Sequence, residues 1–131
     1  MKRISTVFVA LLGFLLLGSS LCLSPMRASS RRETAVVEFT ETVKLSGVLL
    51  RGQYLIVHDE EKMARGEPCT WVYAGNEMND TKLVASFHCT HVDRERADSF
   101  KITYRRHLTP YETPEIAEIQ FAGSTDGHKV P

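Results

Sequence analysis

The amino-acid sequence predicts a small all-β domain, either an antiparallel β-sandwich or a partly open barrel of about six to seven strands. Three observations support this fold class. Short segments rich in β-branched and aromatic residues alternate apolar with polar side chains, turn-forming residues separate these segments at close spacing, and no long stretch has the period of an amphipathic helix. A segment of different composition precedes this domain.

That first segment is typical of a secretory signal peptide. Lys2 and Arg3 precede an uncharged apolar run over residues 4–17, and small residues follow at positions 18–20. The run is short for a membrane span, which needs about 20 apolar residues. We therefore expect a signal peptide over residues 1–20, with residue 28 as the latest alternative end, and a secreted or periplasmic protein. An uncleaved signal segment would be its only membrane contact.

The remaining chain is nearly neutral and long enough for one domain. Without residues 1–20 it carries 14 Lys+Arg against 16 Asp+Glu, a formal charge of −2. This balance gives no electrostatic basis for binding nucleic acid. We expect a flexible leader over residues 21–34, a β-sandwich over 35–123 and a polar C-terminal tail over 124–131.

The first two strands of the domain have clear patterns. Val37, Phe39, Val43 and Leu45 alternate with polar residues, which predicts a half-buried strand, and Glu41 interrupts the apolar row, which indicates a bulge or an edge. After it comes a pair of short strands within 46–58. A tight turn is predicted between them at residues 51–52, because glycine tolerates a positive φ.

The later segments predict one hairpin and two further strands. Residues 60–68 do not alternate and indicate one helical turn or an ordered loop. Residues 69–73 and 82–92 are expected to pair across a loop rich in turn formers. Residues 99–108 and 115–123 supply the other strands. Asn79, at the hairpin tip, opens an Asn-Asp-Thr glycosylation acceptor that is relevant in a eukaryotic source.

Cys69 and Cys89 are predicted to form a disulfide. An exported domain folds where thiols oxidise, so paired cysteines are interpreted first as a bridge. A hairpin register that sets Cys69 opposite Cys89 brings their Cβ atoms close, and it also stacks Trp71 on Phe87 beside the bridge. In the chain-entropy model, a loop of this length stabilises the fold by about 3 kcal/mol.

A zinc or copper site is the alternative interpretation of the same cysteines. His91 follows Cys89 by two residues and therefore lies on the same face of a strand. With Cys69, and with His58 or His88 as a fourth ligand, these residues form a Cys₂His₂ set. The sequence lacks the C-x₂-C and H-x₃-H spacings typical of zinc sites, and two free thiols are the third possibility. Under the disulfide interpretation no cofactor is expected.

The expected function is that of an exported, disulfide-stapled accessory protein of the periplasm or cell envelope, with a binding or structural role. No catalytic motif is present, so we expect no enzyme. Trp71, Tyr73 and Tyr104 are a possible ligand-binding face, and the partner would be an envelope protein or a small ligand. The alternative function is periplasmic binding of zinc or copper through Cys69, Cys89 and His91.

Four segments resemble parts of small exported bacterial proteins from Acidobacteria-like genomes. The first is SGVLLRGQYLIV (Ser46–Val57), a hydrophobic strand and a glycine-containing turn followed by a tyrosine that opens the next strand. The others are EPCTWVY, ASFHCTHV and EIQFAGSTDGHKVP. The resemblance covers most of residues 35–131, although those proteins often have proline where Arg51 stands here. It implies an exported β domain and assigns no activity and no catalytic residue.

Overall fold

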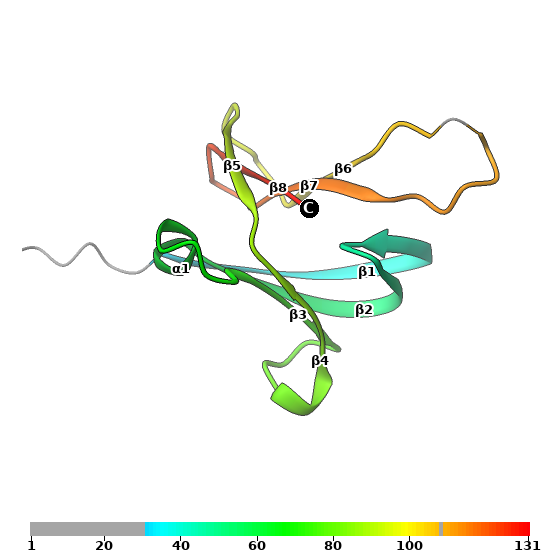
Figure 1. Cartoon of the computed structure of the whole chain (residues 1–131), viewed down its shortest axis with the longest axis horizontal. Coiled ribbons are helices and arrows are strands. Elements are labelled where there is room, and N and C mark those ends of the chain that lie inside the picture. The colour runs from blue at the N-terminus through cyan, green and yellow to red at the C-terminus, as the bar shows by residue number, and fades with distance from the viewer. Residues whose placement is uncertain (1–30, 108) are drawn as a thin grey trace, which may run out of the picture.

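The computed structural model describes residues 31–107 and 109–131, which form two antiparallel sheets of four strands each (Figure 1). The first sheet has the order β1-β2-β3-β4, and the second has the order β5-β8-β7-β6. The strands are β1 (Arg32–Leu45), β2 (Val48–Asp59), β3 (Thr70–Ala74), β4 (Leu83–Phe87), β5 (Thr90–Asp93), β6 (Lys101–Tyr104), β7 (Ile116–Gln120) and β8 (Asp126–Lys129). The predicted all-β sandwich is confirmed.

The predicted signal peptide and most of the predicted leader lie outside the described residues. The end of that leader, residues 32–34, is already part of β1, where it pairs with residues 57–59 of β2. Among the residues that the structure describes, no helix is long and apolar enough to cross a membrane.

The β1–β2 hairpin turns at Ser46 and Gly47, where both residues have positive φ angles, 47° and 85°. The tight turn predicted at residues 51–52 is wrong, because β2 runs without a break through Gly52. Gly52 has a φ of 96° and pairs with Phe39, at the point where the register of β1 shifts. Gly52 therefore provides the positive φ at a β-bulge and not at a turn. The irregularity expected around Glu41 is confirmed.

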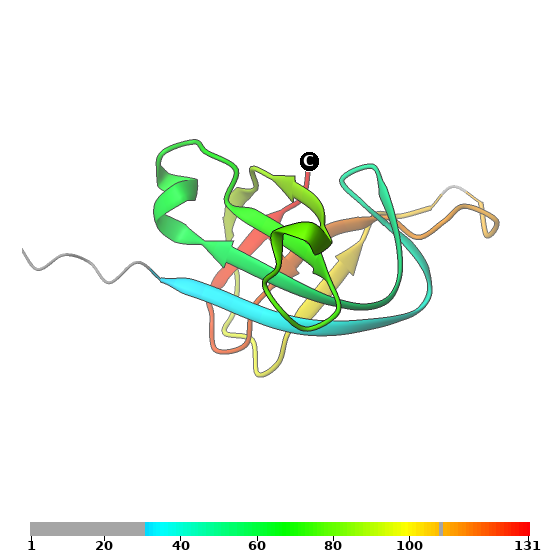
Figure 2. The same cartoon turned by 90° about the horizontal axis from the view of Figure 1, so that it is seen from below.

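The core lies between the two sheets. Phe39, Val43 and Leu45 are buried as the alternation predicted, and Val37 packs against them. Both sheets supply the remaining apolar side chains of the core, which include Leu50, Ile56, Val72, Phe87, Ile116, Ile119, Phe121 and Val130. Seen from below, the strands of the second sheet run across those of the first (Figure 2).

The segment 82–92, predicted as one strand, is divided between the sheets. β4 ends at Phe87 in the first sheet, and β5 begins at Thr90 in the second. The backbone N–H of Cys69 donates to the carbonyl of Phe87 (3.0 Å). His88 and Cys89 then connect β4 to β5, and Figure 1 shows the chain passing from the first sheet to the second between these two strands. Cys89 thus lies where the two sheets meet.

The C-terminal segment is a strand and not the predicted polar tail. Asp126–Lys129 is β8, which pairs with β5 on one side and with β7 on the other. Val130 continues this segment into the core, and its backbone N–H donates to the carbonyl of Ala117 (2.9 Å). The four residues of this strand, Asp-Gly-His-Lys, contain no apolar side chain, so no period-two pattern of apolar and polar residues marks them as a strand.

The segment 60–68, left open between a helical turn and a loop, contains the helix α1 (Glu60–Ala64). Asp59 caps it, since its carboxylate accepts the backbone N–H of Lys62 (3.2 Å). A second short helix, of the 3-10 type, covers Asp80–Lys82. In Figure 1, α1 lies at the same end of the molecule as the β4–β5 crossover.

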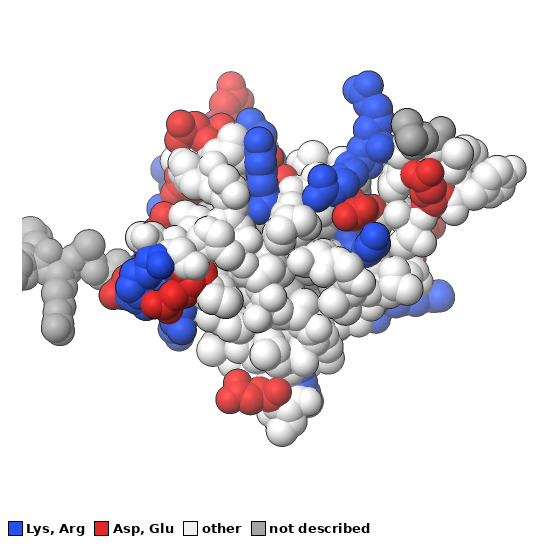
Figure 3. Space-filling view, viewed as in Figure 1, with Lys and Arg blue, Asp and Glu red and all other residues white. Residues whose placement is uncertain are grey.

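Charged side chains of both signs lie mainly at the margins of the face seen in Figure 3, around a wide uncharged area. No region of a single sign stands out on this face.

Candidate metal centre

Three potential metal ligands come together at the end of the molecule that carries α1. His58 lies near the C-terminal end of β2, Cys69 directly precedes β3, and Cys89 lies in the crossover between β4 and β5. All three are buried, with exposed fractions of 0%, 0% and 1%. His58 faces inward because its strand neighbour Val57 packs on the outer face of the sheet.

The donor atoms of this cluster are close enough to bind one ion. The Sγ atoms of Cys69 and Cys89 are 3.1 Å apart, and Cys89 Sγ lies 3.6 Å from His58 Nδ1. The ligand atoms of the three residues all lie within 4.8 Å of one another. We refer to His58, Cys69 and Cys89 as the Cys–His cluster.

These distances can be compared with those around a bound ion. With zinc–sulfur bonds of about 2.3 Å and zinc–nitrogen bonds of about 2.0–2.1 Å, a tetrahedral ion sets sulfur and nitrogen ligands about 3.6 Å apart and two sulfurs about 3.8 Å apart. The Cys89–His58 separation matches the first value without movement. The two sulfurs would have to separate by about 0.7 Å to hold a zinc-sized ion.

His58 is oriented as a ligating histidine usually is. Its Nε2 lies 3.3 Å from the Glu60 carboxylate, which leaves Nδ1 facing Thr70 Oγ1 (3.2 Å) and Cys89. A carboxylate on the far nitrogen fixes the tautomer and orientation of a metal-bound imidazole. Burial, followed by the charge of His128, lowers the pKa of His58, and the contact with Glu60 opposes this shift. Ligation requires the neutral ring that a lowered pKa favours.

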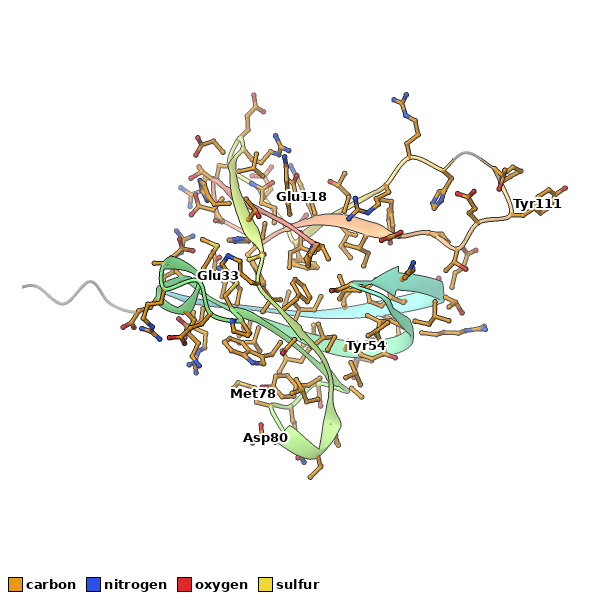
Figure 4. All side chains as sticks on the ribbon, in the orientation of Figure 1. Glu33, Tyr54, Met78, Asp80, Tyr111 and Glu118 are labelled. Atoms are coloured by element: carbon orange, nitrogen blue, oxygen red, sulfur yellow. The ribbon has the colours of Figure 1, made fainter. Side chains whose placement is uncertain are left out.

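A second buried imidazole lies beside the cluster. His128, from β8, is fully buried, and its ring centroid is 3.9 Å from that of His58. Its Nδ1 lies 3.8 Å from Cys89 Sγ. Its Nε2 lies 3.5 Å from Glu33 Oε2, and this nitrogen has no well-formed hydrogen bond to the described part of the chain. Figure 4 shows Glu33 at the same end as α1.

The thioether sulfur of a methionine also lies close to Cys89. Met63, in α1, places its Sδ 3.6 Å from Cys89 Sγ and is partly buried. An open hollow of about 420 Å³ lies over this point, lined by Glu60, Met63, Ala64, His88, Cys89, Thr90 and His91. The hollow gives an ion a route from solvent to Cys89.

The predicted disulfide is absent, since Cys69 and Cys89 are free thiols in this structure. The register that supported the prediction is also wrong. Trp71 pairs with Ser86 and not with Phe87, because β3 and β4 are offset by one residue and the ladder is irregular after Val72. The two sulfurs are nevertheless neighbours, because both cysteines lie just beyond the paired residues.

The metal-free Cys89 is a poor nucleophile. Burial, with a further contribution from its contact with Cys69, raises the pKa of the Cys89 thiol to about 12. At neutral pH this group is a protonated thiol, whereas nucleophilic attack requires a thiolate.

The other predicted ligands lie outside the cluster. His91 is exposed, and its ring nitrogens lie 3.0 Å from Asp93 and 3.8 Å from Asp126. His88 is exposed too, with Nδ1 3.0 Å from the carbonyl of Glu67 and 4.0 Å from Cys69 Sγ. Of the predicted set, the structure therefore brings together the two cysteines and His58.

The aromatic residues predicted as a ligand face do not share one. Trp71 and Tyr73 pack with Leu55 and Val57 on the outer face of the first sheet. Tyr104 is partly exposed in β6 of the second sheet.

Two residues of the site, His128 and Met63, were missed from the sequence. His128 could have been identified from its spacing of two from Val130, because this spacing places both residues on one face of a strand. Met63 could have been identified from Asp59 followed by acidic residues, because this capping pattern marks the start of a helix.

Comparison with known proteins gives no match: no protein-family model, curated protein or solved structure matches this chain. The resemblance to small exported bacterial proteins stays a prediction, and the function is argued from the site alone.

Proposed function

We propose that this protein binds a thiophilic metal ion, zinc or copper, in its Cys–His cluster. The observation that carries the proposal is the burial of two thiols and one carboxylate-oriented imidazole, whose ligand atoms lie within 4.8 Å of one another. Buried polar groups are expensive unless they are paired or bind an ion. His128 and Met63 place two more donors within 3.8 Å of Cys89 Sγ.

The donor types define the class of ion. Thiolates and imidazoles favour Zn²⁺, Cu⁺ and related metals, whereas Mg²⁺ and Ca²⁺ prefer oxygen ligands. Binding would displace the thiol protons, since the thiolate is the ligand. The raised pKa of Cys89 makes this displacement costly, and affinity is therefore expected to increase with pH.

We also propose that the domain is exported and acts as a non-catalytic accessory protein that binds an envelope protein or a small ligand. The signal-like composition of residues 1–20 supports export. The protonated state of the Cys89 thiol supports the absence of cysteine-based catalysis. Fractionation of cells that produce the full chain tests export, and recovery of the uncut chain in the cytoplasm would contradict it.

Native mass spectrometry of the reduced protein with added Zn²⁺ or Cu⁺ tests the metal site. We expect one ion per chain in the parent and a large loss of binding in Cys89→Ser and His58→Gln. His91→Gln is the matched control, because the sequence predicted His91 as a ligand, whereas the structure leaves it exposed and outside the cluster. Metal retained in Cys89→Ser, or lost in His91→Gln, would refute the assignment.

A disulfide between Cys69 and Cys89 is the second candidate state, and the 3.1 Å separation of their sulfurs favours it. A disulfide bond is about 2.05 Å long, so closure requires an approach of about 1 Å. The bridge would stabilise the domain by about 3 kcal/mol in the chain-entropy model, and it would leave no thiolate for a metal.

The same spectra separate the two candidates. Protein isolated without reductant, with Cys22 replaced by serine, either carries a metal or has a mass two hydrogens lower than the dithiol. A bridged protein that binds no ion even after reduction would establish the disulfide function and remove the metal function.

A further inference from the structure

The ligands around Cys89 include a thioether, and this feature distinguishes copper from zinc. In proteins, zinc is bound by thiolate, imidazole and carboxylate. Thioether sulfur selects copper, particularly Cu⁺. Met63 Sδ lies 3.6 Å from Cys89 Sγ, the same distance as His58 Nδ1.

Building on the metal site proposed above, we propose that its ion is Cu⁺, held by the thiolates of Cys69 and Cys89, by Nδ1 of His58 and by the thioether of Met63. Binding forms Cu–S and Cu–N bonds, and the two thiol protons pass to solvent. No change in oxidation state is involved when copper arrives as Cu⁺.

Met63 is placed for this role by the local fold. The capped helix α1 follows β2 directly, so it brings Met63 over the cluster only five residues after His58. Met63 packs against the core and also lines the hollow above Cys89. Cys89 lines the same hollow and is more deeply buried than Met63, so both sulfurs face the space through which an ion would arrive.

The distance between the two thiol sulfurs does not distinguish copper from zinc. The low coordination numbers that Cu⁺ accepts open the angle between its ligands, so two thiolates on Cu⁺ also lie farther apart than 3.1 Å. The 3.1 Å separation of the two sulfurs would have to grow by about 0.7 Å for regular tetrahedral zinc. A site with one weak, adaptable ligand on a short helix accommodates irregular geometry better than a rigid one.

Met63→Leu tests the proposal because leucine has nearly the same volume and no metal-binding atom. Met78→Leu is the matched control, since Met78 is exposed on the loop after β3 and outside the cluster. The full chain, reduced and with Cys22 replaced by serine, is titrated anaerobically with Cu⁺ against a chromogenic Cu⁺ chelator. Parallel titrations use Zn²⁺ or Co²⁺.

We expect the Cu⁺ affinity of Met63→Leu to fall about tenfold or more, with Zn²⁺ affinity and Met78→Leu unchanged. Equal Cu⁺ affinity in Met63→Leu and the parent would overturn the copper assignment and leave the metal site standing. Parallel losses for Cu⁺ and Zn²⁺ would also overturn it, since they indicate a packing role. A parent that binds neither ion would overturn both proposals.

Discussion

Replacing His128 by leucine is expected to stabilise the metal-free protein. His128 is fully buried in the interior strand β8, and its Nε2 has no well-formed hydrogen bond to residues 31–107 or 109–131. The nearest acceptor to that nitrogen is Glu33 Oε2 at 3.5 Å, and Glu33 keeps a 2.8 Å bond from Arg31 on its other oxygen. The substitution therefore removes a polar group from the interior and leaves Glu33 with its bond from Arg31.

The size of the effect follows from two opposing terms. A buried polar atom without a partner costs about 1–3 kcal/mol, and an apolar replacement of similar volume in a packed core costs less than about 1.5 kcal/mol. Mid-range values give a net gain of about 1 kcal/mol. For a domain of this size that gain raises Tm by about 4–8 °C.

The assay is thermal and urea unfolding of reduced protein with a strong chelator present. Glu33→Gln serves as the control, because it weakens the same contact from the other side and keeps the imidazole buried. In the presence of Cu⁺ or Zn²⁺ the difference in stability between His128→Leu and the parent is expected to change. The reason is that the substitution removes an imidazole that lies 3.8 Å from Cys89 Sγ. The stabilisation by added metal should therefore be smaller in the variant than in the parent.

A lower stability of metal-free His128→Leu, by more than about 1 kcal/mol, would refute this reasoning. It would mean that His128 is a satisfied core residue whose packing and contact with Glu33 exceed the cost of burying its ring. An unchanged response to metal in the same variant would further separate His128 from the site.

Two other predictions concern the second sheet. Gly127→Ala should destabilise the domain by about 1–3 kcal/mol in urea unfolding. The added Cβ would lie 2.5 Å from Glu118 Oε1, and the two hydrogen bonds from Arg94 hold this carboxylate in place. An unchanged urea midpoint would show that the Arg94–Glu118 ion pair can move aside. Acid unfolding should depend on Glu118, whose pKa is lowered by the hydrogen bond from Arg94 against the effect of burial. A lowered carboxyl pKa contributes stability above the ordinary glutamate value, and this stability is lost as pH falls through the lowered value. Glu118→Gln should therefore remove the decrease in Tm at acidic pH that comes from protonation of Glu118. Identical curves of Tm against pH for variant and parent would contradict this role of Glu118.

Much of the fold could be predicted from local patterns. The alternation of Val37, Phe39, Val43 and Leu45 identified the inner face of β1, because a strand that buries one face has a period of two. The bulge near Glu41 was visible as a break in that alternation. The position of the first hairpin turn could not be predicted in this way. Both Gly47 and Gly52 adopt a positive φ, and only Gly47 lies in a turn.

The site was harder to predict because it depends on the join between the sheets. Local pattern does not reveal that one continuous strand-like segment changes sheet at His88 and Cys89. The error put Cys89 and His91 on one face, whereas the crossover turns Cys89 inward and leaves His91 exposed. The burial of His128 likewise depends on β5 and β7 pairing on either side of β8, and a single sequence does not show that pairing.

The position of the cluster connects metal binding to the docking of the two sheets. His58 and Cys69 belong to the first sheet and its connections, and Cys89 lies in the segment that joins the two sheets. His128, which lies beside the cluster, belongs to the second sheet. No ligand pair is adjacent in sequence, so the unfolded chain presents no preformed site, and the free energy of binding adds to that of folding. Arrival of the ion at the hollow beside Met63 would therefore hold the sheets together at the end where their connection is a crossover of only two residues.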